Sequence, residues 1–132
     1  MSIDVKEILE NARTIAVVGL SSNPDRPSNR VARYMQDQGY KIIPVNPTVK
    51  EVLGEKAYPR LKDIPEKVDI VDVFRRSEDI PSIADEAIAI KAEVLWMQEG
   101  IINEPAAERA EAAGLKVIMD RCIMIAHIHS HV

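Results

Sequence analysis

The sequence has a single cysteine, Cys122, which excludes an intramolecular disulfide framework and a cysteine-rich metal site. It has no apolar run near the roughly 20 residues that a membrane-spanning helix needs. It also has no excess of basic residues, because 17 lysines and arginines stand against 21 acidic residues and give a net charge of −4. These absences argue against membrane insertion and against nucleic acid as the main partner. A site for an anion would need positive charge concentrated in one place.

What is present is typical of one globular domain. The chain has 132 residues, of which 46% are hydrophobic, so it is long enough to bury a substantial core. Residues 2–7 form a polar, acidic start that argues against a secretory signal. No linker or low-complexity segment interrupts the pattern. We therefore expect one cytoplasmic domain that spans residues 1–132.

Apolar runs without polar alternation recur along the chain, as in strands that are buried on both faces of a parallel sheet. We expect strands at residues 14–18, 40–45, 68–74, 94–97 and 115–119, and helices at about residues 4–12, 28–38, 80–88 and 103–113. This alternation predicts an α/β fold, a doubly wound, Rossmann-like parallel sheet of about five strands flanked by helices. We expect Pro44 and Pro47 to stop the second strand, and residues 46–65 to lack regular structure except for a turn near residues 60–64.

The loop after the first predicted strand has the features of an anion site. It precedes a helix N-terminus, where free N–H groups and the helix dipole favour a phosphate. A polar turn in which Ser28 only caps the helix is the alternative. The dinucleotide pattern G-x-G-x-x-G would begin at Gly19, but Ser21 and Pro24 replace its later glycines, which disfavours NAD(P) or a flavin. The candidate binding residues of this loop are Gly19, Leu20, Ser21, Ser22, Asn23, Arg26, Pro27 and Ser28.

The end of the second strand offers further candidates. Asn46 and Pro47 stand where dinucleotide-binding sheets usually place an acid that holds the ribose hydroxyls. Lys50, just beyond them, suits a phosphorylated ribose instead. The alternative is a proline-rigidified turn with a solvated lysine.

The ends of the third and fourth strands also carry polar or aromatic side chains. Phe74 can flank an adenine ring, and Arg75 and Arg76 can meet phosphates, although a solvated arginine pair is the alternative. Gln98 and Glu99 follow the fourth strand and are expected to face the same edge of the sheet. Glu99 is the candidate general base there, and nothing in the sequence pairs with it.

Three other features have a structural interpretation. Trp96 lies within an apolar run and is expected in the core, and Cys122 is expected to be a small buried hydrophobic residue. The tail has histidines at every second position, His127, His129 and His131. On an extended segment these rings would share one face and could bind a transition metal, and an unspecific polar tail is the alternative.

These loops resemble those of the small CoA-binding domain proteins, stand-alone relatives of the domain that opens the α subunit of succinyl-CoA synthetases. The likeness runs from about residue 14 to residue 125. The segments that carry it are Val17-Val18-Gly19-Leu20-Ser21, Asn23-Pro24-Asp25-Arg26-Pro27-Ser28, Pro44-Val45-Asn46-Pro47, Leu53-Gly54, Val71-Asp72-Val73-Phe74-Arg75, Trp96-Met97-Gln98-Glu99-Gly100 and Met119-Asp120-Arg121-Cys122.

The resemblance implies a ligand, coenzyme A. It implies that the loop from Gly19 to Asn23, with Arg26, holds the CoA phosphates, that Lys50 lies near the nucleotide, and that Gln98 and Glu99 help to hold CoA. It would also explain the missing acid after the second strand, because an acid would repel the 3′-phosphate of CoA. The histidine that is phosphorylated in the synthetases belongs to a second domain that this sequence does not match. The resemblance therefore implies no reaction.

We expect a protein that binds CoA or an acyl-CoA, with no catalytic residue and no metal site. Three alternatives stay open: a part of an acyl-CoA ligase or transferase that a partner chain completes, a redox role in which Cys122 forms a mixed disulfide with CoA, and an NAD(P)-binding protein. A protein partner or a second copy of the chain is compatible with the sequence, but no residue identifies one.

Overall fold

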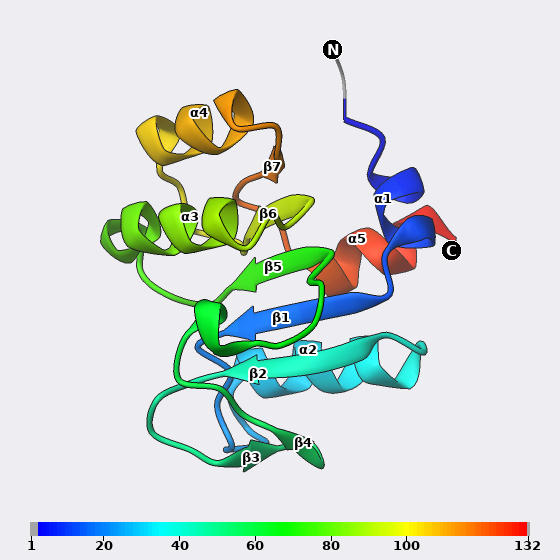
Figure 1. The fold of residues 1–132 in the computed structure, drawn as a ribbon. Coiled ribbons are helices and arrows are strands. Elements are labelled where there is room, and N and C mark those ends of the chain that lie inside the picture. Colours follow the sequence, from blue (N-terminus) through cyan, green and yellow to red (C-terminus); the bar gives the residue numbers. More distant parts are fainter. Residues whose placement is uncertain (1–2, 132) are drawn as a thin grey trace.

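Strands and helices alternate along the chain and build one parallel sheet between two helical layers (Figure 1). The structure is a computed structural model that describes residues 3–131, so the first residue of the polar start, Ser2, lies outside it. The elements are α1 (Val5–Asn11), β1 (Thr14–Val18), α2 (Pro27–Asp37), β2 (Lys41–Val45), β3 (Glu51–Val52), β4 (Glu55–Lys56), η1 (Leu61–Asp63), β5 (Ile70–Val73), η2 (Ser77–Asp79), α3 (Ile80–Ala89), β6 (Val94–Met97), α4 (Glu104–Ala112), β7 (Lys116–Ile118) and α5 (Ile123–Ser130).

The main sheet has five parallel strands in the order β2-β1-β5-β6-β7. The chain therefore moves from β1 to one neighbour, β2, and then crosses to its other neighbour, β5. This confirms the predicted doubly wound fold and places the reversal of strand order between β1 and β5. Within residues 3–131, no helix is both long and apolar enough to span a bilayer.

Alternate residues of the strands face two separate cores. One core joins Val71 and Leu95 of the sheet to α3, α4 and η1, and the other joins Ile15 and Trp96 to α1, α2 and α5. Trp96 is fully buried, as predicted, and its indole N–H donates to the carbonyl of Arg121 at 2.8 Å. Helices thus pack on both faces of the sheet. The polar residues gather at the amino-terminal and carboxyl-terminal ends of its strands, called here the amino-terminal and carboxyl-terminal edges.

Helix ends follow the signals in the sequence. Asp4 accepts a hydrogen bond from the backbone N–H of Glu7 at 3.1 Å and begins α1. Asn103 does the same for Ala106 at 3.1 Å and begins α4, with a proline in the first turn.

The second strand differs from the expectation because it runs through Pro44. β2 is the outer strand of the sheet, and the Pro44 carbonyl accepts from the Tyr58 N–H at 2.9 Å rather than from β1. The proline nitrogen points the same way, so the pairing with β1 loses no hydrogen bond. The connection after β2 also contains a short hairpin, β3–β4, which the sequence analysis did not predict. The expected turn near residues 60–64 is present as η1.

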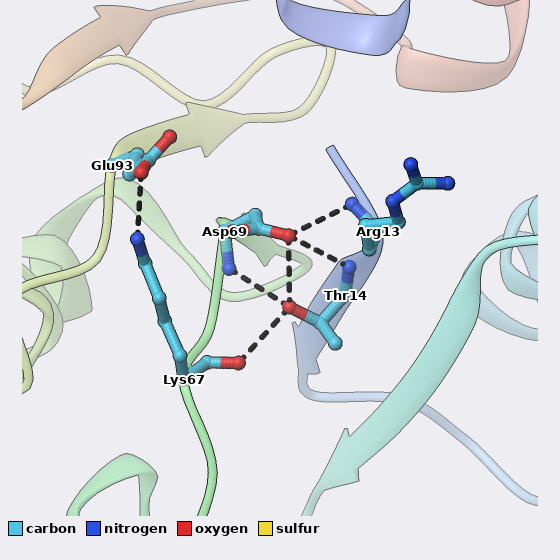
Figure 2. Close-up of polar contacts among 5 residues, drawn as sticks. All are labelled: Arg13, Thr14, Lys67, Asp69 and Glu93. Carbon is cyan, nitrogen blue, oxygen red and sulfur yellow. Dashed lines mark hydrogen bonds and ion pairs between the residues drawn. The ribbon is translucent and has the colours of Figure 1, made fainter. Parts of the chain in front are cut away.

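At the amino-terminal edge of the sheet, Asp69 ties the start of β1 to the segment before β5 (Figure 2). Its carboxylate accepts from the backbone N–H groups of Arg13 at 2.8 Å and Thr14 at 3.1 Å. Its own N–H donates to the Thr14 hydroxyl at 3.0 Å. Beside it, Lys67 pairs with Glu93 at 2.9 Å. These contacts tie the edge together beside a hollow of about 370 Å³ that Asp69 and Glu93 line.

Candidate functional site

The carboxyl-terminal edge of the sheet gathers the loops that the sequence analysis singled out. Ligands of doubly wound sheets bind outside this edge, where the strand order reverses. Here that point lies between β1 and β5. The loops after β1, β2, β5 and β6 all begin at this edge, and each carries predicted binding residues.

The loop after β1 is held by its own side chains. The Ser21 N–H donates to the Ser28 hydroxyl at 3.0 Å, and the Asn23 N–H donates to the Ser21 hydroxyl at 3.0 Å. The Asn29 side-chain amide donates to the Ser21 carbonyl at 2.9 Å. The expectation that Ser28 caps α2 is wrong, because Arg26 is the N-cap residue and forms no side-chain cap bond. Pro27 occupies the first helical position, and the buried Ser28 hydroxyl orients the loop instead.

Three backbone N–H groups of this region have no hydrogen-bond partner within residues 3–131, those of Leu20, Ser22 and Ser28. They lie in the loop and in the first turn of α2, where the helix dipole also favours a negative charge. Arg26 and Ser22 are exposed beside them. The arrangement suits a phosphate group.

Gly19 brings this loop against the end of β5. Its φ is +86°, a conformation that favours glycine, and a Cβ there would lie 2.8 Å from the Phe74 carbonyl oxygen and 3.0 Å from Cδ of Arg75. Its N–H donates to the carbonyl of Val45 at 2.9 Å. Gly19 therefore joins the ends of three neighbouring strands.

The loop after β2 places its predicted residues differently. The Asn46 side chain donates to the Leu20 carbonyl at 2.9 Å and accepts from the Thr48 N–H at 2.9 Å, so it holds two loops together. Pro47 lines a hollow beside Gly19. Lys50 is exposed and lines no hollow at this edge. The structure does not bring Lys50 to the other candidates.

Two hollows lie at this edge of the sheet. The first hollow, of about 560 Å³, lies between the ends of β1 and β2 and the start of α3. The second hollow, of about 800 Å³, lies beside the ends of β5 and β6 and the start of α5. Arg75 lines both of them, so the two hollows are neighbours. The first is lined by Val18, Gly19, Val45, Pro47, Pro59, Arg60, Leu61, Arg75, Asp79, Ser82, Ile83 and Glu86, and the second by Phe74, Arg75, Arg76, Gln98, Glu99, Ile101, Cys122 and Ile125.

The positive charge at the hollows is partly paired. Arg75 lies 3.4 Å from the Asp79 carboxylate, and Arg76 lies 3.1 Å from that of Glu78. Arg60, which the sequence analysis missed, lies 3.8 Å from Glu86 in the first hollow. The arginines of these pairs are exposed, so they can turn to an anionic ligand at little cost. Within residues 3–131, Oε1 of Glu86 is buried and accepts no hydrogen bond.

The second hollow has a buried acid behind it that the sequence analysis also missed. Asp72 of β5 is 1% exposed, and its carboxylate accepts a hydrogen bond from the side-chain amide of Gln98, itself 4% exposed. Burial raises the pKa of Asp72 from its ordinary value to about 7, and the hydrogen bond from Gln98 opposes that shift. An acid inside the apolar strand Ile70–Val73 is the sequence signal that could have found it.

Asn29 is a second polar residue that the sequence analysis missed. It is 3% exposed, and its side-chain carbonyl oxygen has no hydrogen-bond partner. Native proteins leave few such groups unpaired. It lies in the first turns of α2, next to the loop that holds the free N–H groups.

Cys122 and the histidines fall elsewhere than expected. Cys122 is half-buried and lines the second hollow, just before α5. The extended segment on which the three rings would share a face does not form, because residues 123–130 form α5. His127 is buried and its Nδ1 lies 2.9 Å from the Tyr34 hydroxyl, whereas His129 is exposed. Within residues 3–131, no three His, Cys, Asp or Glu side chains are grouped so that they could hold a metal ion.

The fold described above defines a class, the doubly wound α/β domains, whose ligands generally bind at the carboxyl edge of the parallel sheet. The model of one family in this class, described as the CoA binding domain, matches residues 13–128. The chain therefore belongs to the CoA binding domain family, as its loops suggested.

The relatives fall into two groups. "Uncharacterized protein YneT" of Bacillus subtilis is 52% identical over 124 residues, which cover 94% of this chain and 92% of that protein. The solved structure of a Thermus thermophilus protein, cell-free ID.343, is 37% identical with a TM-score of 0.92 and covers 97% of this chain and 99% of that one. Both are close to this chain in length.

The second group consists of larger enzymes. The α subunit of acetate–CoA ligase (ADP-forming) II of Pyrococcus furiosus is 30% identical over 132 aligned residues, which cover 92% of this chain but only 29% of that subunit. The chain thus matches less than a third of the length of this ligase subunit.

Proposed function

We propose that this protein binds coenzyme A or an acyl-CoA and catalyses no reaction on it alone. The observation that carries the proposal is that Arg75 lines two neighbouring hollows and lies against Gly19, at the start of the loop that holds the free N–H groups. The first hollow is lined by two arginines, and the second is more apolar. CoA has the same arrangement, because its pyrophosphate lies between the nucleotide and the pantetheine arm.

The pyrophosphate is proposed to lie at the N–H groups of Leu20, Ser22 and Ser28, beside Arg26. The adenosine lies in the first hollow, where Arg60 and Arg75 meet its 3′-phosphate. From the pyrophosphate, the pantetheine arm runs past Arg75 into the second hollow, along Phe74, Arg76, Gln98 and Glu99. Lys50 has no part in this placement.

The absence of catalysis is proposed from the side chains at the hollows. Glu99 is exposed and forms no hydrogen bond or ion pair with another residue of the described chain, so nothing there orients it as a base. His127 is engaged with Tyr34 inside the helical layer rather than at the hollows. We further propose that the domain works in the cytoplasm, where CoA is available.

Calorimetry with CoA, dephospho-CoA and NADP tests the ligand. We expect CoA to bind, dephospho-CoA to bind more weakly because it lacks the 3′-phosphate, and NADP not to bind. Arg75→Gln should weaken CoA at least tenfold, since a hydrogen bond to a charged group contributes about 1.5–3 kcal/mol. Arg13→Gln is the matched control, because Arg13 is exposed at the opposite edge and should bind CoA like the wild type (Figure 2). Binding of NADP with no binding of CoA would overturn the proposal.

A second candidate follows from the ligase relatives. The match to 29% of a ligase α subunit favours a domain that a separate chain completes into an enzyme. This version predicts that acetate, CoA and ATP give no ADP with the chain alone, and that adding a partner starts the reaction. A chain that forms acetyl-CoA without any partner would contradict both versions.

A further inference from the structure

The pair formed by Asp72 and Gln98 has a fixed direction. Asp72 is sealed inside β5, and its carboxylate accepts from Nε2 of Gln98. Gln98 follows β6 directly and lines the second hollow. Within residues 3–131, the other end of its amide, Oε1, forms no hydrogen bond.

A carboxylate can only accept hydrogen bonds, so it holds the NH₂ end of an amide and turns the carbonyl end away. In this protein Gln98 lines the second hollow, and within residues 3–131 its unpaired Oε1 is not one of the fully buried side-chain atoms without a partner. An accessible amide oxygen at the wall of a hollow is suited to a ligand that donates an N–H group. The pantetheine arm of CoA contains secondary amides of that kind.

We propose that Asp72 is a positioning residue that turns the Gln98 carbonyl oxygen toward the second hollow, where it accepts a hydrogen bond from an amide N–H of the pantetheine arm. This inference rests on the proposed function and adds to it a residue that never touches the ligand. It also assigns Gln98 a specific contact, with the arm rather than with the nucleotide.

Ligand binding through this pair should depend on pH. When Asp72 takes up a proton, it becomes a donor, and the Gln98 carbonyl can turn inward to accept from it. The hollow then faces an NH₂ group, which cannot accept from the ligand. Binding through the arm should therefore strengthen as the pH rises through the titration of Asp72, whose pKa burial raises to about 7.

The groups around Asp72 allow this effect to be isolated. Its neighbours on the adjacent strands, Val17 and Trp96, do not titrate. Among the residues that line the second hollow, the ionisable side chains are those of Arg75, Arg76, Glu99 and Cys122. On the helical layer that covers this face, His127 is buried and its pKa is lowered by that burial.

The experiment measures the affinity for CoA from pH 6 to 8.5 in the wild type, Asp72→Asn and Cys122→Ser. Between pH 6 and pH 8.5, we expect the affinity for CoA to rise about three- to tenfold more in the wild type than in Asp72→Asn. This factor corresponds to the free energy of one neutral hydrogen bond. Cys122→Ser should keep the wild-type rise. Titration of the ligand phosphates is common to all three proteins and cancels in the comparison. An unchanged rise in Asp72→Asn would overturn the inference.

A second experiment tests the contact between Gln98 and the pantetheine arm. Gln98→Met keeps the volume of the side chain and removes its acceptor, so CoA should bind about three- to tenfold more weakly. Adenosine 3′,5′-bisphosphate, which lacks the arm, should bind this variant like the wild type. If both ligands bind the variant more weakly by the same factor, or if neither does, the inference is overturned. The proposed function, CoA binding by the wild type, would still stand. If the wild type binds no CoA at any pH, the proposed function fails first.

A measurement on the wild type avoids variants that fold poorly. The carboxyl carbon resonance of Asp72 reports its protonation directly in a pH titration. Bound CoA should lower the pKa of Asp72, because the ligand favours the carboxylate, and adenosine 3′,5′-bisphosphate should leave it unchanged. A pKa that CoA leaves unchanged or raises would contradict the proposed role.

Discussion

At the amino-terminal edge of the sheet, the Asp69 carboxylate accepts from the backbone of Arg13 and Thr14, and the Lys67 ammonium meets Glu93 (Figure 2). At the carboxyl-terminal edge, by contrast, Asn29 has a buried carbonyl oxygen without a partner. Several backbone N–H groups around it are also free within residues 3–131. Both edges are rich in polar groups, but within residues 3–131 the buried side-chain atoms without a partner, on Asn29 and Glu86, lie at the carboxyl-terminal edge.

This difference separates stability from binding within one small domain. A paired polar group stabilises the fold, and an unpaired one costs stability unless a ligand or water completes it. We therefore expect substitutions at the amino edge to change the free energy of unfolding and leave CoA binding unaltered. Substitutions at the carboxyl edge should change binding, and removing a buried charge there should even stabilise the protein.

The largest effect is expected for Asp69→Ala. The substitution leaves the N–H groups of Arg13 and Thr14 without an acceptor, so the free energy of unfolding should fall by about 2–4 kcal/mol. Urea denaturation measures the loss, and calorimetry on the folded protein should give the wild-type affinity for CoA. Lys67→Ala is the control, because its ion pair is exposed and should contribute nothing measurable. A folded Asp69→Ala protein that binds CoA poorly would erase the distinction between the edges.

The next effect has the opposite sign and comes from Asp72→Asn. The raised pKa of Asp72 means that the folded protein holds its proton up to about pH 7, whereas the unfolded chain loses it near pH 3.8. The stability associated with the protonated acid is fully present below the unfolded pKa and is lost as the pH rises to the folded pKa. An asparagine at this position does not titrate, so the variant has no such loss. The free energy of unfolding of the variant, relative to that of the wild type, should thus be about 2–3 kcal/mol higher at pH 8 than at pH 5.

Paired urea titrations at pH 5 and pH 8 measure this gain. Groups that titrate equally in both proteins, such as His127, cancel in the difference. An advantage of the Asp72→Asn variant that is the same at both pH values would show that Asp72 does not titrate in this range, and the carboxyl edge would then hold a permanent charge.

Two glycines separate the cost of backbone strain at positive φ from the cost of a steric clash with a neighbouring strand. Gly19 and Gly54 both have positive φ, at +86° and +77°, but a Cβ meets the Phe74 carbonyl at Gly19 and nothing within 4 Å at Gly54. Gly54→Ala should cost about 1 kcal/mol from backbone strain alone, and Gly19→Ala about 2 kcal/mol because the end of β5 must also move. Since Arg75 moves with it, CoA should bind Gly19→Ala at least tenfold more weakly and Gly54→Ala normally. Equal losses of stability and affinity in both variants would remove the special role of Gly19.

Most of the fold could be predicted because the strands are continuous apolar runs and the helices have clear caps. The run Val94–Met97 forms β6 as predicted, and Asn103 begins α4. The same reasoning failed where tertiary context decides. Pro44 continues β2 because that strand is at the edge of the sheet, and the alternating histidines join a helix because Ala126 and His127 pack into the core.

The candidate site was predicted at the level of loops rather than contacts. Doubly wound topology brings the carboxyl ends of the strands to one edge, and Gly19, Phe74, Arg75 and Gln98 line the hollows there. The sequence could not separate residues that line a hollow from those that hold the loops, such as Asn46 and Ser28. Arg60 was missed because it lies in a connection without periodicity, after the hairpin.

The smallest expected effect on CoA affinity is that of Lys50→Ala. This substitution tests which residues belong to the binding site and which lie outside it. The family resemblance implied a lysine near the nucleotide, but Lys50 lies before β3, exposed and outside both hollows. CoA affinity should change less than about twofold, the weak effect expected for a screened surface charge. Arg60→Ala, at the hollow itself, should weaken CoA by a larger factor and dephospho-CoA hardly at all. The reverse order, with Lys50 dominant, would mean that the 3′-phosphate is read by the hairpin connection, and the nucleotide end of the site would then lie outside the first hollow.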